Sequence, residues 1–331
     1  MKATSILAGF AMLVAATGPA AATDTATSRT STSGEERAQA GGAVLPAIPE
    51  APTPFELSDA ELERGTKQFA AEVALVLTTY DPQETLEDIA RRLPERSNPE
   101  AVSAAIQSLH HPGSWSRGSI VYPQLGGLLP EQLSVMVVVE QQIGTPTGIR
   151  TETRTLDIRV GRDEEGWFFE GLASHGGEPV PRPDTLGPEA RAVLDHAHIE
   201  LPDSARWDIH AGRVAPELLA LMARAADEVP FGVLVFDSGH PWNIFGTDRM
   251  SDHTRGVAVD IHRIGQQLVI DDRVEGGVTH RFVQWLYEQP DLANIGSPWA
   301  LDGFGGRSFT DLLHQDHLHV AVSRAHAVRE R

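Results

Sequence analysis

The sequence contains no cysteine, and this absence limits how the fold is stabilised and how a metal could be held. Without cysteine there are no disulfide bonds, and a lipid anchor attached through cysteine is excluded. Any metal ion must be bound by nitrogen and oxygen atoms alone. An exported form of this chain would have to hold its fold without covalent cross-links.

Basic side chains are too few to balance the acidic ones. Lys and Arg together number 27 against 46 Asp and Glu, which gives a formal net charge of −19. Phosphate backbones repel such a chain, so no nucleic-acid partner is expected. The length of 331 residues suits about two domains with sizeable cores.

An apolar run long enough for a confident membrane span is missing at the N-terminus, where the run at residues 6–16 is too short. Lys2 precedes this run and Ala20-Ala21-Ala22 follows it, a pattern typical of a secretory signal peptide over residues 1–22. We therefore expect a secreted or otherwise extracytoplasmic protein of the cell envelope, with no stable membrane span after cleavage. A retained N-terminal anchor is the alternative.

Residues 23–55 are mostly small, polar or Pro and contain hardly any large apolar side chain. Such a segment cannot bury enough surface to offset its ordering entropy, so we expect a disordered linker. Residues 175–185 are rich in Pro and Gly, follow neither hydrophobic period, and predict a second linker.

Between these linkers, residues 56–174 predict a small α+β accessory domain. The capping box Ser58-Asp-Ala-Glu61 predicts a helix with a buried stripe, and Asp81 and Asn98 each precede a proline and predict further helix caps. The stripe consists of Phe69, Val73, Leu75 and Val76. Strands are expected at 133–141, 153–160 and 166–173. Helices followed by an antiparallel meander are similar in outline to NTF2-like domains.

Residues 186–328 predict a second α+β domain with a four-stranded antiparallel sheet. Helices are expected at 188–196, 215–228 and 279–288. Strands are expected at 232–238, 256–264, 267–270 and 317–322.

The stretch Ser251-Asp-His-Thr-Arg-Gly-Val-Ala-Val-Asp260 carries the strongest chemical signal. It places His253 in a loop and Asp260 on an alternating, strand-like run. A third metal ligand is available in His317-Leu-His319, which belongs to another strand-like run. Two nitrogens and one oxygen leave the fourth position of a tetrahedral zinc ion open, as in catalytic zinc sites.

These motifs resemble the zinc peptidases of peptidoglycan, the D-Ala-D-Ala carboxypeptidase and L-Ala-D-Glu endopeptidase family. This family belongs to the wider lysostaphin/D-Ala-D-Ala-peptidase/hedgehog group. The resemblance covers about residues 186–322 and implies that His253, Asp260 and His319 bind Zn²⁺. It also implies that the substrates are peptidoglycan peptides and that the domain has the four-stranded antiparallel core of this group.

Two residues compete for the role of general base. The resemblance places an acid three residues before the last ligand, which corresponds to Asp316. Strand parity instead puts His317 on the same face as His319 and turns Asp316 away, unless an irregularity re-aims it. The wider group gives a catalytic role to the first histidine of His-x-His. We favour Asp316 as the base with His317 polarising the substrate or moving a proton, and both assignments stay open.

Further residues are expected around the ligands or the substrate. Ser251 belongs to the motif, and Asp252 and His262 could accept or donate hydrogen bonds behind the ligating imidazoles. The family has an arginine before the first ligand that binds the substrate carboxylate, where this chain has His240. Arg249 or Arg255 could replace that arginine. If neither does, cleavage within a peptide is favoured over carboxypeptidase action.

The sequence therefore predicts a secreted zinc metallopeptidase that cleaves peptidoglycan stem peptides or cross-links. One alternative is a non-catalytic, zinc-containing protein that binds or regulates the cell wall. Another is a zinc amidase of a different substrate class.

Overall fold

The computed structural model describes residues 44–303 and 305–323, which belong to one compact unit. The predicted signal peptide, most of the linker predicted at 23–55 and the last residues of the domain predicted at 186–328 lie outside these ranges. Residues 44–55 contain no helix or strand, and the carbonyls of Pro46 and Pro49 accept hydrogen bonds from Trp115 and Arg117. In the described part of the chain, no helix has the length and apolarity that a membrane crossing requires.

Three helices come first: α1 (Arg64–Thr78), α2 (Leu86–Ala90) and α3 (Pro99–Leu109). The cap predicted at Asn98 is confirmed, because its side chain accepts hydrogen bonds from two backbone N–H groups of the first turn of α3. The cap predicted at Asp81 is wrong, since α2 begins only after Thr85, which forms a capping box with Asp88.

The capping box predicted at Ser58 is also wrong. Helix α1 begins after Glu63, which has a left-handed φ of 49° and provides no side-chain cap. Ser58 instead accepts a hydrogen bond from the N–H of Ala60 in a local turn and contacts Asp271. The residues of α1 in the hydrophobic core are Ala70, Val73, Ala74 and Leu77, so Val73 of the predicted stripe is confirmed, while Phe69 and Val76 are only partly buried against the same core.

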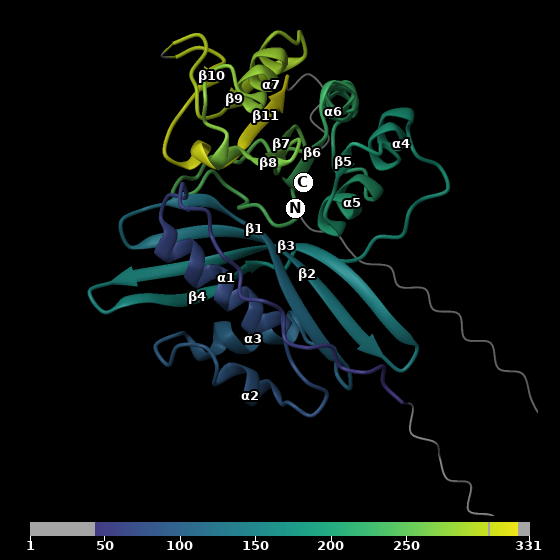
Figure 1. Cartoon of the computed structure of the whole chain (residues 1–331), viewed down its shortest axis with the longest axis vertical. Coiled ribbons are helices and arrows are strands. Elements are labelled where there is room, and N and C mark those ends of the chain that lie inside the picture. The colour runs from purple at the N-terminus through teal and green to yellow at the C-terminus, as the bar shows by residue number, and fades with distance from the viewer. Residues whose placement is uncertain (1–43, 304, 324–331) are drawn as a thin grey trace, which may run out of the picture. The chain divides into compact units, whose positions relative to one another are not determined.

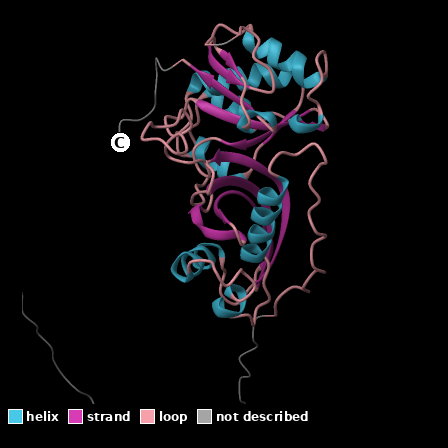
Figure 2. Ribbon diagram, turned by 90° about the vertical axis from the view of Figure 1, so that its left-hand side faces the viewer, coloured by secondary structure: helices cyan, strands magenta, loops and turns pink. Residues whose placement is uncertain are grey.

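The first sheet is antiparallel, in the order β1 (Trp115–Leu128), β2 (Gln132–Thr145), β3 (Gly148–Asp163) and β4 (Gly166–Ser174). Figure 1 shows α1 and α3 against this sheet, and Figure 2 shows how strongly its strands curve. Strand β1 is missing from the prediction because Pro123 and the Gly126-Gly127 pair interrupt its pattern. Proline is tolerated there because β1 is an edge strand, and its pairing with β2 is irregular near both places.

Strand β2 is buried on both faces. Alternate residues, among them Leu133 and Val135, pack with α1, α2 and α3 in one hydrophobic core. Met136 and Val138 point the other way and form a second cluster with Tyr122 and with Leu234 and Val235 of the second sheet. The apolar run of β2 therefore joins the two sheets.

The second sheet has seven strands, whereas four antiparallel strands were predicted. Its order is β10 (Ser308–Phe309), β9 (Leu292–Gly296), β11 (Leu318–Val322), β7 (Ala258–Ile264), β6 (Phe231–Val235) and β5 (Ile199–Glu200), with β8 (Gln267–Leu268) paired to β7. The four central strands, β9 to β6, are antiparallel, while β10 and β5 are added in parallel at the edges. The α+β class is confirmed. The prediction missed β5, β9 and β10, which are short and carry no clear alternation.

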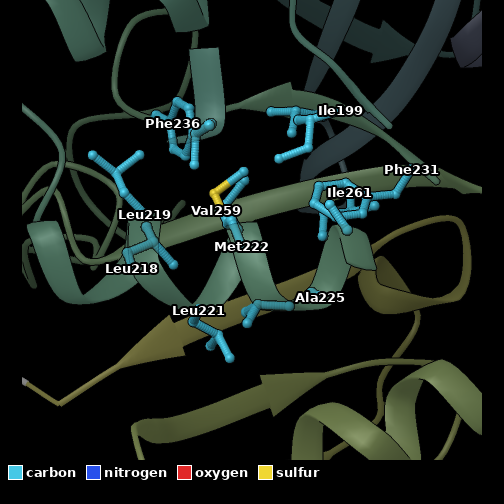
Figure 3. Close-up of a cluster of buried hydrophobic side chains, with 14 of the residues drawn as sticks. Ile199, Leu218, Leu219, Leu221, Met222, Ala225, Phe231, Phe236, Val259 and Ile261 are labelled. Atoms are coloured by element: carbon cyan, nitrogen blue, oxygen red, sulfur yellow. The ribbon is translucent and has the colours of Figure 1, made fainter. Parts of the chain in front are cut away.

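Helices cover one face of this sheet: α4 (Pro188–Leu194), α5 (Asp203–His210), α6 (Pro216–Glu228) and α7 (Val278–Tyr287). Two 3₁₀ turns complete the set, η1 (Val269–Asp271) and η2 (Leu313–Gln315). Val259 and Ile261 of β7 pack into the same core as Leu218 and Met222 of α6 (Figure 3). The alternate residue Asp260 therefore lies on the opposite face, on the side of the first sheet.

Candidate metal centre

Two side chains of the site come from neighbouring strands of the second sheet. Asp260 of β7 and His319 of β11 are direct partners in the antiparallel register, so their side chains lie on the same face. His319 Nδ1 is 3.2 Å from Asp260 Oδ1. On the other side of His319, Gly296 of β9 carries no side chain and leaves room for the ring of His314. The strand register thus brings a nitrogen and an oxygen to one point.

His253 reaches the same point from the loop before β7. The backbone N–H of His253 donates to Ser251 Oγ, and Gly256 has a φ of 70° that lets the chain turn into the strand. The imidazole is fully buried, and its Nδ1 is 2.7 Å from the carbonyl oxygen of Phe236. A carbonyl can only accept, so Nδ1 carries a hydrogen, and in the neutral imidazole, the form that binds a metal, Nε2 keeps a lone pair.

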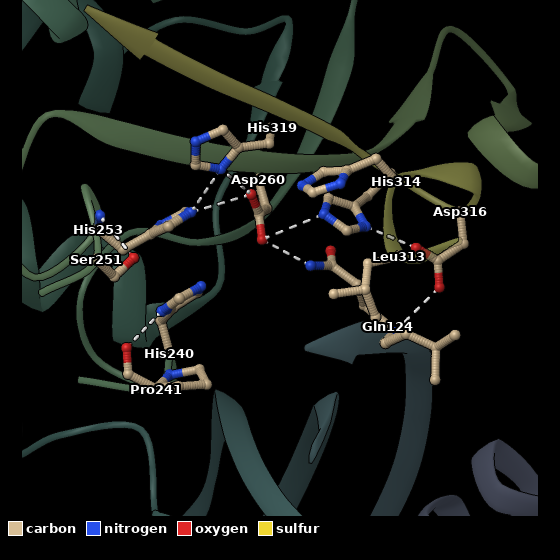
Figure 4. Close-up of polar contacts among 12 residues, drawn as sticks. Gln124, His240, Pro241, Ser251, His253, Asp260, Leu313, His314, Asp316 and His319 are labelled. Carbon is tan, nitrogen blue, oxygen red and sulfur yellow. Dashed lines mark hydrogen bonds and ion pairs between the residues drawn. The ribbon is translucent and has the colours of Figure 1, made fainter. Parts of the chain in front are cut away.

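That lone pair points at the other two groups. His253 Nε2 is 3.0 Å from His319 Nδ1 and 3.1 Å from Asp260 Oδ1 (Figure 4). Acceptor atoms this close repel one another unless a cation or a shared proton lies between them. The spacing is near ~3.3 Å, the edge of a tetrahedron whose metal–ligand bonds are ~2.0–2.1 Å. The donor set therefore fits a small divalent ion.

His240 brings a fourth side chain to this place. Ligand atoms of His240, His253 and Asp260 all lie within 4.8 Å of one another, so this group could also hold a metal ion. The His240 ring stacks on that of His253 at 3.9 Å, and its Nδ1 is 2.7 Å from the carbonyl of Pro241. The set with His319 is more compact, at 3.0–3.2 Å, and we take it as the primary one, with His240 at the same site.

The turn that carries His240 is held from both sides. The buried Asp208 accepts hydrogen bonds from the backbone N–H groups of Asp237 and Ser238, at 3.0 and 2.8 Å. Gly239 has a φ of 107°, and a Cβ there would lie 2.5 Å from the backbone oxygen of Thr155 in β3. A glycine is therefore required where the first sheet approaches this turn.

Asp316 and His317 form a pair beside the metal ligands. His317 Nδ1 is 2.6 Å from Asp316 Oδ1, and His317 Nε2 is 3.7 Å from Asp260 Oδ2. Asp316 ends the 3₁₀ turn η2 before β11 begins, so strand parity does not apply to it. Its other oxygen accepts from the N–H of Leu125 and forms an ion pair with Lys67. His317 faces the pocket, and Asp316 lies behind it.

The charges of these groups are set by burial and by one another. Burial alone would raise the pKa of Asp316, but Lys67 and the hydrogen bond from His317 lower it to about 2. The pKa of Asp260 lies well below its usual range, because the nearby His253 and His317 outweigh the effect of burial. Burial lowers the pKa of His319 to about 4 and that of His240 well below its usual value. Neutral imidazoles and an ionised carboxylate are the ligand forms of these side chains.

The pKa of His317 moves in the opposite direction. Burial lowers it, but the carboxylates of Asp260 and Asp316 raise it by more, so the net shift is upward. His317 is thus the buried imidazole of this site that most readily holds a second proton.

A pocket of about 550 Å³ opens over these groups. Its wall includes Ile244, Phe245 and Arg249, from the loop that precedes His253. Opposite walls come from β10 and η2, which supply Phe309 and His314, and from β1. Sequence reasoning missed Gln124, Leu125, Lys67 and His314. Gln124 and Leu125 belong to β1 of the other sheet and Lys67 belongs to α1, and no local spacing pointed to them.

The remaining predicted residues differ in how close they lie. Ser251, Asp252 and Arg249 line the pocket, whereas Arg255 is not among its lining residues and pairs with Asp252 at 2.9 Å. His262 does not line the pocket either. Its ring stacks on Tyr122 of β1 at 5.3 Å, and within the described residues its Nδ1 has no hydrogen-bond partner.

Comparisons with known proteins add little to this geometry. No protein family and no curated protein matches the chain. An IcmL-like type IV secretion system protein of Legionella pneumophila is similar over 38% of this chain and 98% of its own, with 14% identity and a TM-score of 0.30. An Ntf2-like protein involved in plasmid conjugation is similar over 47% of this chain and 70% of its own, with 14% identity and a TM-score of 0.25. Likenesses of this size carry no argument about fold or function.

Proposed function

We propose that this protein is an extracytoplasmic zinc metallopeptidase that hydrolyses peptide bonds in peptidoglycan stem peptides or cross-links. In this proposal the second sheet and its helices form a hedgehog/D-Ala-D-Ala-peptidase-like domain, and the first sheet with α1 to α3 forms an NTF2-like one. The observation that carries the proposal is the convergence of His253 Nε2, Asp260 Oδ1 and His319 Nδ1 within 3.2 Å. In this proposal, these three residues are the ligands of the zinc ion.

A zinc ion bound here would supply Lewis-acid activation of a scissile carbonyl and of water. In the proposal His317 supplies proton transfer, because its ring lines the pocket and its Nε2 lies beside the ligand Asp260, 3.7 Å from Oδ2, where it can take a proton from the attacking water and return it to the leaving amine. Asp316 orients His317, since its Oδ1 engages His317 Nδ1 while its Oδ2 is held by Leu125 and Lys67. Of the two assignments that the sequence leaves open, this geometry favours His317 as the acid/base group.

Arg249 is the best candidate for binding a substrate carboxylate. It is exposed and lines the pocket, whereas the guanidinium of Arg255 is engaged by Asp252. A guanidinium that keeps its fork free can bind a carboxylate through two parallel hydrogen bonds.

The test is mass spectrometry of peptidoglycan fragments after digestion by the wild type, by the wild type with a chelator, and by His253→Ala. We expect new amino and carboxyl ends within peptides from the zinc-loaded wild type alone. His198→Ala is the matched control, because His198 is exposed and belongs to a second His-x-His motif at the end of α4, outside the pocket. This variant should cleave as the wild type does.

Other outcomes would point to the alternatives. Zinc binding without cleavage would favour a cell-wall binding or regulatory protein. Release of peptides from the sugar chain would favour an amidase. Cleavage that survives both the chelator and His253→Ala would exclude the metallopeptidase.

A further inference from the structure

Asp260 and Asp316 each have one oxygen that is held by the first sheet or its helices. Asp260 Oδ1 faces His253 and His319, while Asp260 Oδ2 accepts a 2.6 Å hydrogen bond from Gln124 Nε2 of β1 (Figure 4). Gln124 has no exposed surface. Its amide therefore fixes the rotation of the Asp260 carboxylate.

Asp316 is held in the same way. Its Oδ1 engages His317, while Oδ2 lies 2.6 Å from Lys67 Nζ of α1 and 3.0 Å from the backbone N of Leu125. A carboxylate with both oxygens occupied cannot turn away from the imidazole that it orients.

Lys67 is unusual in this sequence. Lys2 is the only other lysine, and arginine supplies the remaining strongly basic side chains. Lys67 is completely buried between the carboxylates of Glu61 and Asp316, and Tyr122 donates a 2.7 Å hydrogen bond to Glu61. A buried ammonium is tolerated only when it is paired, and its compact group with three donors can bridge two carboxylates. The position therefore suits lysine rather than arginine.

We propose that Gln124 and Lys67 are positioning residues of the metal centre, so that the first sheet and its helices complete the site on the second. Gln124 holds Asp260 so that one oxygen binds the ion, and Lys67 holds Asp316 and through it His317. The part that concerns Gln124 rests on metal binding, and the effect of Lys67 on turnover rests on the proposed function.

Gln124→Met, which is similar in size but lacks the donor, tests the first half. The full-length chain is titrated with zinc against a chromophoric chelator, and the visible spectrum of the cobalt-loaded protein is recorded. We expect zinc affinity to fall ~10–100-fold, the usual effect of losing a partner behind a metal ligand. The cobalt bands should shift as well.

Gln141→Met is the matched control. Gln141 is a fully buried glutamine of β2 whose amide donates to Ser116 Oγ at 2.9 Å, and it does not line the pocket. It should lose stability but keep its zinc affinity and cobalt spectrum. Equal zinc affinity in wild type and Gln124→Met would overturn the inference, as would an equal loss in both variants.

The double variant Glu61→Gln/Lys67→Met tests the second half, because it removes the lysine without leaving Glu61 as an unpaired buried charge. We expect kcat per zinc-loaded molecule to fall ~10–100-fold with little change in KM or zinc affinity. The proton NMR signal of His317 Nδ1–H should move, since Asp316 loses its anchor. Unchanged kcat and an unchanged NMR signal would overturn the role of Lys67.

The experiments distinguish failure of the proposed peptidase function from failure of the positioning role of Gln124 and Lys67. If the wild type binds zinc but cleaves no peptide, the proposed function is wrong, and the zinc affinity of Gln124→Met and the His317 signal still decide the inference. If the wild type binds neither zinc nor cobalt, both are wrong.

Discussion

At the scale of single residues, Asp316 and His317 differ in the bonds that they already make. The Asp316 carboxylate has a partner on each oxygen and does not line the pocket, whereas His317 lines it, with Nδ1 on Asp316 and Nε2 3.7 Å from Asp260 Oδ2. A group that takes a proton from water must reach that water, and of the two residues only the imidazole lines the pocket.

His317→Ala should therefore lower kcat more than Asp316→Asn does. Loss of a general acid/base group costs ~10²–10⁴-fold, while loss of an orienting partner costs ~10–100-fold. Both variants should keep their zinc affinity, because neither residue belongs to the primary donor set. Steady-state kinetics on a defined peptidoglycan peptide measures this. A larger loss for Asp316→Asn would reinstate Asp316 as the base.

The donor set could be predicted from the sequence, but its surroundings could not. The seven-residue interval between His253 and Asp260 and the His-x-His motif are local patterns that anticipate side chains on a common face. Gln124 lies 136 residues from its partner Asp260, and nothing near Gln124 in the sequence indicates a metal site. Such contacts depend on how two sheets pack, which periodicity does not encode.

At the scale of elements, some predicted helix starts are right and others are wrong. Asn98-Pro99 correctly predicts a helix start, because a cap and a proline act locally. Ser58 does not cap a helix, because its hydroxyl contacts Asp271 and accepts a hydrogen bond from Ala60 in a turn. The parity argument for Asp316 and His317 assumed a regular strand, although His317 does line the pocket and Asp316 does not. Asp316 in fact follows the 3₁₀ turn η2, and the strand β11 begins only at Leu318.

Asn98→Ala should lower the free energy of unfolding by ~1 kcal/mol, because two N–H groups at the start of α3 lose their acceptor. Urea denaturation followed by circular dichroism measures the change. Gln107→Ala, on the exposed side of the same helix, is the control and should stay within ~0.5 kcal/mol of the wild type. No difference between the two variants would contradict the cap.

At the scale of the whole molecule, the hydrophobic cluster between the two sheets is in direct contact with residues around the site. Tyr122 packs with Val138 and Leu234 between the sheets, stacks on His262 and donates to Glu61 in the Lys67 network. Each of the two predicted domains, at 56–174 and 186–328, contains one of the sheets, and both sheets lie in one compact unit. The prediction gave no indication that β2 would be apolar on both faces because of the second sheet.

Removing the metal should destabilise the whole fold. An ion that binds only the folded state stabilises it by ~2.7 kcal/mol at a free concentration of 100 Kd, so a chelator should lower the Tm of the zinc-loaded wild type. His253→Ala should show no such dependence, and His198→Ala should behave as the wild type does. Differential scanning fluorimetry measures this. An identical response to zinc in His253→Ala would contradict the assigned ligand.

Because Lys67 is buried, the folded chain offers very few amines to reagents that acylate amines. Apart from Lys2 and the terminal amine, an acylating reagent has a single target, and that target has no exposed surface and two carboxylate partners. Lys67 should stay unmodified in the native protein and become labelled only as fast as the network around Glu61 opens. Peptide mapping at successive times would measure the rate of Lys67 labelling and thereby the rate of that opening.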